Sequence, residues 1–131
     1  MSDTKQTRQQ AIEEGKQKDI SDVAREAGLL VPVFITTTVW DTWITPDEEG
    51  IKQGENEQTR IRNVMEKLLY YIRVHRQTNK SNLIYFPVPM SKKGKEENVQ
   101  LLSYLGPIER TDNRPCITIM IPEEYETEQV N

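Results

Sequence analysis

The sequence predicts an α+β fold: a small antiparallel sheet of three to four strands, one long helix packed across it, and short N-terminal helices. Two observations lead to this prediction. Apolar residues recur at helical spacing between positions 58 and 80. In the last third of the chain, short apolar and β-branched runs are joined by short polar links, which is typical of an antiparallel meander.

Local patterns predict the individual elements. The long helix is expected to bury one apolar stripe, made of Ile61, Val64, Met65, Leu68, Leu69 and Ile72. Short helices are expected to close at Gly15 and Gly28, and the threonines at 36–38 offer N-caps for a third. We therefore expect short helices at 8–14, 22–28 and 39–44, a loop at 45–58, and strands at 29–35, 83–87, 99–105 and 116–121. Proline lacks the N–H that a ladder needs, so strand ends or sheet edges are expected at Pro32, Pro87 and Pro89.

The length of 131 residues fits a single domain. We place it at 19–122, after a flexible or frayed-helix N-terminus at 1–18 and before an acidic, disordered tail at 123–131. The net charge of −4 reflects 21 acids against 17 bases. Subtracting the four glutamates of the tail leaves 17 acids against 17 bases, so the body of the chain is neutral.

Several bulk features bear on the compartment. No apolar run approaches the roughly 18 residues that a membrane-spanning helix needs. The polar N-terminus has no apolar segment of the kind that a secretory signal contains. Cys116 is the single cysteine, which excludes a disulfide within the chain and fits a reducing compartment. These features predict a cytoplasmic protein that does not enter a membrane.

The stretch DVAREAG at 22–28 is similar to the first helix of a helix-turn-helix repressor headpiece. Such a headpiece needs a second, polar helix whose side chains reach base edges. Here LLVPVFI follows instead, and no Arg, Lys, Asn or Gln occurs between Glu26 and Lys52. Pro32 and the β-branched residues oppose a helix at this point. We interpret the stretch as a short amphipathic helix that does not read DNA.

Basic residues gather in and after the long helix. Within 58–80 the only acidic residue is Glu66, and Tyr70, Tyr71 and His75 lie among the basic residues. Such a face would contact phosphates and stack bases. The candidate phosphate-binding residues are Arg60, Arg62, Arg73, Arg76, Lys92 and Lys93. The simpler interpretation, favoured by the neutral body, is the solvated face of a surface helix.

Patterns for catalysis and metal binding are scarce. A zinc site of the ordinary kind needs several Cys or His ligands, and the chain has only Cys116 and His75. Cys116 lies in the apolar run CITIMI, so we expect a buried core thiol. We assign no catalytic residue, metal ligand or cofactor. A carboxylate Mg²⁺ site remains an alternative to a mobile loop for the acids Asp47, Glu48, Glu49, Glu55 and Glu57.

Trp40 and Trp43 lie three residues apart and are expected on one face of the short helix at 39–44. Burial in the core is the simpler interpretation. The alternative is an aromatic anchor for a partner protein, because tryptophan is enriched among the residues that dominate interfaces. The candidate partner-binding residues are Trp40, Asp41, Trp43, Glu55 and Glu57.

Four segments in order resemble a family of short uncharacterised proteins carried on bacterial phages, plasmids and integrated elements. They are AREAG, PVFITTTVW, the helix start GENEQTR and the final PCITIMIP. The family pattern at the helix start is GQDExxR, so Glu55 and Asn56 depart from it, whereas Glu57 and Arg60 match. At this position Glu57 is expected to accept backbone N–H groups. The resemblance implies a mobile-element accessory protein in a bacterial cytoplasm and implies no activity.

These observations lead to three functional hypotheses. The first is a non-catalytic accessory protein that binds and modulates or inhibits a protein of the bacterial host, such as a defence factor, or a protein of the element itself. The second is a binder of nucleic acid, a nucleotide or a phosphorylated ligand through the basic face of the 58–80 helix. The third is a small metal-dependent hydrolase. Strand pairing at an open sheet edge would in addition produce a homodimer.

Overall fold

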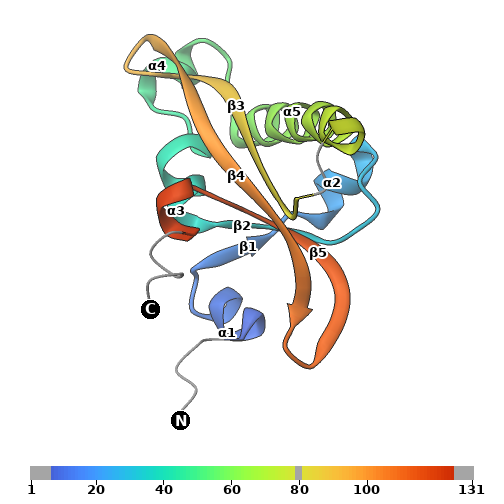
Figure 1. Ribbon diagram of the computed structural model, residues 1–131. Helices are drawn as coiled ribbons and strands as arrows, with labels where there is room; N and C mark the ends of the chain where they lie inside the picture. Colours follow the sequence, from blue (N-terminus) through green and yellow to red (C-terminus); the bar gives the residue numbers. More distant parts are fainter. Residues whose placement is uncertain (1–6, 79–80, 126–131) are drawn as a thin grey trace.

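The computed structural model describes residues 7–78 and 81–125, in which a twisted five-stranded sheet is flanked by helices (Figure 1). The strand order is β1-β2-β5-β4-β3. β2 and β5 run parallel, and the other neighbours run antiparallel. The strands are β1 (Gln17–Asp19), β2 (Val33–Thr36), β3 (Leu83–Lys92), β4 (Lys95–Glu109) and β5 (Asp112–Met120).

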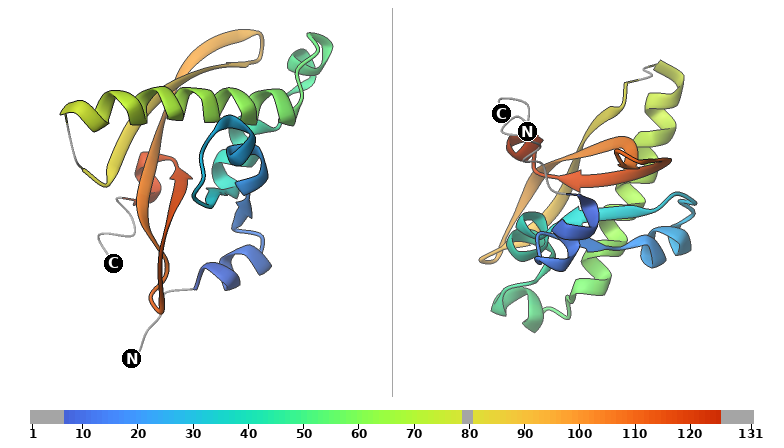
Figure 2. Two further views of the ribbon diagram at one scale, coloured as in Figure 1. Left: turned by 90° about the vertical axis from the view of Figure 1, so that its right-hand side faces the viewer. Right: turned by 90° about the horizontal axis from the view of Figure 1, so that it is seen from below.

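Helical segments precede β1, connect β1 to β2 and connect β2 to β3. They are α1 (Arg8–Glu13), α2 (Ser21–Ala27), α3 (Thr37–Val39), the π-helix η1 (Trp40–Ile44), α4 (Glu48–Lys52) and α5 (Glu57–Thr78). α5 runs across one face of the sheet, with α2 beside it (Figure 2). α1 contributes to the other side of the sheet, where the Arg8 guanidinium lies 4.4 Å from the centroid of the Phe34 ring.

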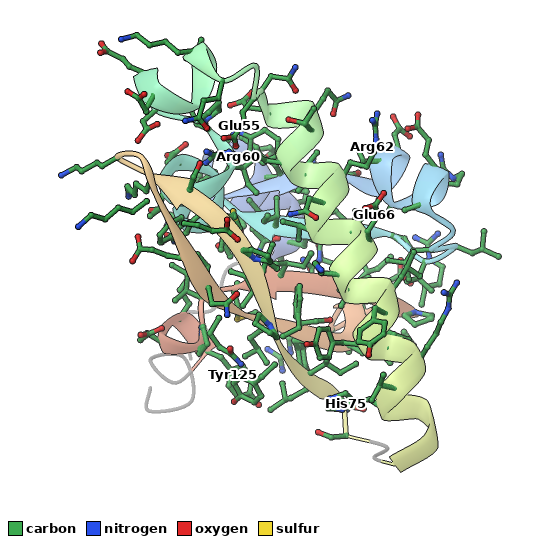
Figure 3. The ribbon with its side chains drawn as sticks, turned by 90° about the horizontal axis from the view of Figure 1, so that it is seen from above. Glu55, Arg60, Arg62, Glu66, His75 and Tyr125 are labelled. Carbon is green, nitrogen blue, oxygen red and sulfur yellow. The ribbon has the colours of Figure 1, made fainter. Side chains whose placement is uncertain are left out.

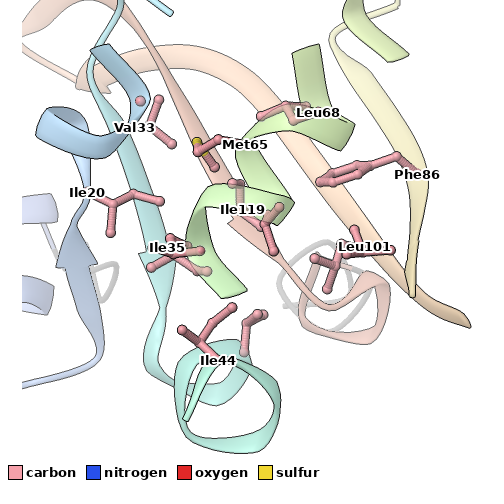
Figure 4. Packing of buried hydrophobic residues seen from close by; sticks show 14 of the residues in the cluster. Ile20, Val33, Ile35, Ile44, Met65, Leu68, Phe86, Leu101 and Ile119 are labelled. Carbon is pink, nitrogen blue, oxygen red and sulfur yellow. The ribbon is translucent and has the colours of Figure 1, made fainter. Parts of the chain in front are cut away.

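The main core lies between α5 and the sheet (Figure 4). Because side chains alternate along a strand, Val33 and Ile35 face this core, whereas Phe34 faces away from it. The predicted helical stripe supplies the facing layer with Ile61, Val64, Met65 and Leu68, none more than 1% exposed. The rest of the sheet contributes Phe86, Val88, Met90, Val99, Leu101, Ile117 and Ile119.

The α+β class, the long helix and the C-terminal meander are confirmed. α5 has 22 residues, and β3, β4 and β5 follow one another as antiparallel neighbours. Gly15 and Gly28, predicted to close the first short helices, have φ of 78° and 110°. This left-handed backbone is accessible to glycine at little cost. Thr36 is the N-cap of α3, and its side chain accepts a hydrogen bond from the Val39 N–H at 3.4 Å.

The sheet is larger than expected and is mixed. The prediction of three to four antiparallel strands missed β1 and the parallel pairing of β2 with β5. β1 is the tripeptide QKD, which has no apolar residue and therefore no strand pattern. The parallel pairing places Ile35 opposite Ile119. Residues so distant in the sequence leave no local signal of their contact.

Several boundaries also differ from expectation. The strand predicted at 29–35 is limited to Val33–Thr36, and those predicted at 99–105 and 116–121 extend over Lys95–Glu109 and Asp112–Met120. β3 continues through Pro87 and Pro89 to Lys92, because it is the outermost strand and proline is tolerated at an edge. The segment predicted as a loop at 45–58 contains α4, which is N-capped by Asp47. The Asp47 carboxylate accepts a hydrogen bond from the Gly50 N–H at 2.9 Å.

Both described chain ends contain local helical structure. Within the N-terminal segment, Thr7 and Gln10 form a capping box at the start of α1. At the other end, residues 122–125 form a helical turn, and Glu124 accepts hydrogen bonds from Thr36 Oγ1 and Ile121 N, both at 2.9 Å. The rest of the predicted tail, 126–131, lies outside the described residues. In the described part of the chain, no helix is long and apolar enough to span a membrane.

Candidate functional site

The two tryptophans lie on a π-turn. The Thr45 N–H donates to the Trp40 carbonyl at 2.9 Å, five residues back, which defines η1. Single π-turns are rare and are found frequently at functional sites. Both indoles pack partly against the core and remain partly exposed, so the core interpretation and the surface interpretation each describe one side of these rings. We call η1, the start of α5 and the tip of the β3–β4 hairpin the tryptophan corner.

Trp40 is fixed to the start of α5 through Glu57. Its Nε1–H donates to Glu57 Oε2 at 3.0 Å, and Thr45 Oγ1 donates to the same oxygen at 2.7 Å. The sequence had led us to expect that the Glu57 carboxylate accepts backbone N–H groups of its own helix. In the structure this carboxylate instead accepts hydrogen bonds from Trp40 and Thr45. Asn56 is the residue that caps α5, because its Oδ1 accepts from the Thr59 N–H at 2.9 Å. Lys18 Nζ lies 5.2 Å from the Trp40 ring centroid.

Trp43 is fixed through its backbone and carries a lysine on its ring. Its carbonyl oxygen accepts a hydrogen bond from Arg60 Nη1 at 2.7 Å. Lys92 Nζ, from the end of β3, lies 4.8 Å from the ring centroid. A cation above an indole face is attracted by the electrons of the ring. Both tryptophans therefore present a ring that is partly covered by a lysine side chain.

Arg60 is buried, with 6% of its surface exposed, and its donors are used within the protein. Nε donates to Glu55 Oε1 at 2.8 Å, and Nη2 donates to the carbonyl of Ser91 at 3.0 Å and to its Oγ at 3.2 Å. Ser91 Oγ in turn donates to Glu55 Oε2 at 3.0 Å. Gly50 packs closely here, since a Cβ on it would lie 3.1 Å from Arg60 Nη2. The guanidinium therefore joins η1, α5 and β3.

The hairpin tip is joined to α4 by Asp47. Besides capping α4, its carboxylate accepts the Lys93 N–H at 2.7 Å. These backbone hydrogen bonds, that from Lys93 foremost, lower the pKa of Asp47 below its ordinary value of 3.8. Lys93 has a φ of 53°, so the tight turn places its N–H toward Asp47. The tip of the hairpin is thereby held against the corner.

Two open pockets flank the corner. One, of about 360 Å³, lies over the Arg60–Glu55 ion pair and is lined by Gln53, Glu55, Thr59, Arg60, Asn63, Pro89, Met90, Ser91 and Glu96. The other, of about 480 Å³, lies beside Trp40 and is lined by Ile12, Gly15, Gln17, Lys18, Asp19, Ile20, Thr37 and Trp40. The corner thus combines fixed aromatic rings with hollows on either side.

The structure brings together most of the candidate partner-binding residues. Trp40 and Glu57 are hydrogen-bonded, Glu55 pairs with the arginine that also binds the Trp43 carbonyl, and Asp41 is exposed on η1. Sequence reasoning missed that these residues form one hydrogen-bonded unit. The sequence signal for this unit was an acid and a base, Glu55 and Arg60, placed five residues apart across the start of a helix.

The candidate phosphate-binding residues do not form one face. Arg60 is enclosed, contrary to expectation, because its ion pair and carbonyl contacts direct it inward (Figure 3). Lys92 lies on Trp43. Arg62, Arg73 and Lys93 are exposed, but Arg62 and Arg73 are separated by about 16 Å along α5, at 1.5 Å per residue. The side chain of Arg76 lies outside the described side chains.

The remaining candidates for chemistry are placed as follows. Cys116 is 1% exposed, which confirms the buried thiol, and burial raises its pKa. Among the acids of 45–58, Asp47, Glu55 and Glu57 accept hydrogen bonds from other groups of the chain. Within residues 7–78 and 81–125, no three or more His, Cys, Asp or Glu side chains are grouped so as to hold a metal ion.

A family model matches residues 4–125, almost the whole chain, and the protein therefore belongs to a family of unknown function, DUF6573. No curated protein and no solved structure shows a significant match to it.

Proposed function

We propose that this member of the DUF6573 family is a non-catalytic accessory protein of mobile genetic elements that binds a bacterial host protein, such as a defence factor, and thereby modulates or inhibits it. The observation that supports this proposal is the tryptophan corner. Two partly exposed indoles are held on a π-turn by Glu57 and Arg60. Rings of this kind are the residues that dominate protein interfaces.

Pre-organisation gives the corner its suitability for binding. Ordering a side chain on binding costs about 0.5–1.5 kcal/mol, and here that cost is met during folding. Glu57 fixes the Trp40 ring, and the Arg60 guanidinium fixes the backbone at Trp43. Lys18, Lys92 and exposed Asp41 surround the rings with charge of both signs. A polar, charged rim around aromatic anchors is the ordinary composition of a protein interface.

The setting rests on the resemblance of the sequence motifs to proteins of phages, plasmids and integrated elements. Such an element acts inside its bacterial host, and the single cysteine suits the reducing cytoplasm. The second candidate, phosphate binding along α5, has less support because Arg60 and Lys92 are engaged within the protein. Its distinguishing property is a steep loss of affinity with salt, since each phosphate contact releases counterions.

The test is capture of partners from a bacterial host lysate on the full chain, with and without nuclease, followed by mass spectrometry. The variant Asp41→Arg reverses an exposed charge beside the indoles, and Glu66→Arg makes the same change on the exposed face of α5. We expect a stoichiometric, nuclease-resistant partner that Asp41→Arg weakens about ten-fold or more and Glu66→Arg does not. A partner lost with nuclease, or equally retained by both variants, would contradict the proposal.

A further inference from the structure

The two edges of the sheet are β1 and β3 (Figure 1). They differ in whether another strand can pair with them. Along an antiparallel pair, successive residues direct their backbone N–H and C=O groups alternately toward the partner strand and away from it. At an edge, the groups that point away are free to bind a further strand unless something removes or occupies them. The hydrogen bonds of this sheet identify those groups.

The β3 edge is closed. The carbonyl oxygen of Asn82 accepts a backbone hydrogen bond from β4 at 2.9 Å, so even-numbered residues bond toward β4 and odd-numbered residues point outward. Two of the outward positions are Pro87 and Pro89, which have no N–H to offer. The outward carbonyl of Ser91 already accepts Arg60 Nη2. A strand arriving at β3 would therefore lack donors at both prolines and a free carbonyl at Ser91, which interrupts a continuous ladder.

The β1 edge is open. The Lys16 carbonyl accepts from the Thr37 N–H, and the Ile20 N–H donates to the Val33 carbonyl, both at 2.9 Å. Even-numbered residues thus bond toward β2, and the backbone groups of Gln17 and Asp19 point outward. Within the described residues, these outward N–H and C=O groups have no hydrogen-bond partner. They are spaced as a strand edge requires.

A hollow runs along this same edge. The pocket of about 480 Å³ beside Trp40 is lined by consecutive residues 17–20, which point to alternate faces of the sheet. A pocket that touches both faces of one short strand lies along its outer edge. Ile12, Ile20 and Trp40 give the pocket apolar walls, and Lys18 adds a positive charge over the Trp40 ring.

We propose that the β1 edge receives an extended segment of the partner protein as an added strand. The inference rests on the proposed function and specifies how the partner binds. The backbone of the segment pairs with Gln17 and Asp19, and one of its apolar side chains enters the pocket beside Trp40. An acidic residue two positions away, on the same face of the added strand, meets Lys18. Main-chain pairing supplies affinity, and the pocket with its lysine supplies specificity.

The test screens a displayed library of short random peptides against the full chain. Asp19→Pro removes an outward N–H while leaving the ladder to β2, as the prolines of β3 do naturally. Asp19→Ala is the matched control, since it also removes the carboxylate that accepts from Ser21 N but keeps the backbone donor. We expect enriched peptides with an apolar residue and an acidic residue two positions apart, bound at least about ten-fold more weakly by Asp19→Pro than by Asp19→Ala.

Amide hydrogen exchange on the unmodified protein provides a readout that does not depend on the proline variant folding. Bound peptide should slow exchange at Gln17 and Asp19 and shift the Trp40 indole resonance. An absence of enriched peptides, equal binding by both variants, or unchanged exchange at these two amides would each overturn the added strand. A dimer of the chain itself that Asp19→Pro abolishes would do so as well, because the edge would then serve self-pairing.

The two proposals can fail separately. A host partner that is weakened by Asp41→Arg and fully retained by Asp19→Pro leaves the tryptophan corner as the binding site and removes the added strand. Enriched peptides that follow the expected pattern, without any stoichiometric host protein on the full chain, leave the strand edge and remove the proposed function.

Discussion

Arg60 connects three separate parts of the chain through one guanidinium group. It pairs with Glu55 before α5, binds the carbonyl of Trp43 in η1 and binds Ser91 in β3. A buried charge is tolerated only when its hydrogen bonds are satisfied, and here four are formed at 2.7–3.2 Å. The corner is therefore built around a charge that has been taken out of solvent at the cost of its hydration.

Removing this guanidinium should be among the most destabilising single changes outside the apolar core. Arg60→Ala leaves Glu55 without its ion pair and the carbonyls of Trp43 and Ser91 without a donor, so we expect a loss of about 3 kcal/mol in the free energy of unfolding. Arg60→Lys should also destabilise, because a single ammonium nitrogen cannot reach the four acceptor atoms that the planar guanidinium binds. Urea unfolding provides the measurement. Arg62→Ala, two residues away and exposed, should change stability by less than about 0.5 kcal/mol, and similar losses in both would contradict this account.

Asp112 and Arg114 form a second charged pair, at the turn between β4 and β5. The Arg114 side chain and then its N–H lower the pKa of Asp112 to about 2. A carboxyl whose pKa is depressed by folding stabilises the folded state above its ordinary value of 3.8, and this contribution is lost as the pH falls through about 2. Arg114→Gln should return the pKa of Asp112 toward 3.8 in an NMR titration of its carboxyl carbon. Lys95→Gln, at the opposite hairpin, should leave that titration unchanged.

At the scale of elements, the start of α5 shows what the sequence can and cannot indicate. The helix itself follows from its apolar stripe, since a period of 3.6 residues is a local property. The sequence led us to expect that Glu57 accepts backbone N–H groups at the helix start, whereas Asn56 caps the helix and Glu57 binds Trp40. Whether the Glu57 carboxylate binds its own helix start or reaches Trp40 depends on where η1 lies, and a local stretch of sequence does not contain that information.

The prolines of β3 act at the same scale, as a block against pairing of the sheet edge. Replacing both, Pro87→Val with Pro89→Val, restores two outward N–H groups on a strand that already favours extended backbone. We expect the double variant to self-associate with rising concentration in sedimentation velocity, whereas the unmodified chain does not do so through this edge. The matched pair Gln100→Val with Asn98→Val changes the residues opposite these prolines on β4 without adding edge donors. Association of equal strength in that control would indicate surface hydrophobicity and not strand pairing.

At the scale of the whole molecule, the fold depends on one contact that local patterns do not reveal. The first part of the chain supplies β1 and β2, the last part supplies the meander, and the parallel pairing of β2 with β5 joins them. The meander was predictable because its strands follow one another directly in the sequence. α5 was predictable because its apolar stripe lies within one continuous segment. The five-stranded sheet was not predictable, because it requires Ile35 to pair with Ile119, which lies far from it in the sequence. For the same reason the sequence suggested candidate site residues one by one, whereas their contacts with one another in one corner were not predictable.

This junction should make the two parts unfold together. Ile35 and Ile119 are neighbours in the register and both are fully buried, so valine at either position should cost about 0.5–1.5 kcal/mol. Because they are in contact range, the double variant should depart from additivity by about 0.5 kcal/mol or more. Exposed Ile51, changed to valine, is the control and should shift the unfolding free energy by less than about 0.5 kcal/mol.

Two probes can follow the two parts separately. Both tryptophans lie in η1, so their emission reports on the N-terminal part, whereas amide exchange in β3 and β4 reports on the meander. If the β2–β5 pairing couples the parts, either valine variant moves both unfolding curves by the same free energy. A variant that moves tryptophan emission while leaving the exchange of β3 and β4 in place would show instead that the meander with α5 is stable alone. In that case the β1 edge and η1 would belong to a separately melting unit, and binding at the β1 edge would stabilise that unit only.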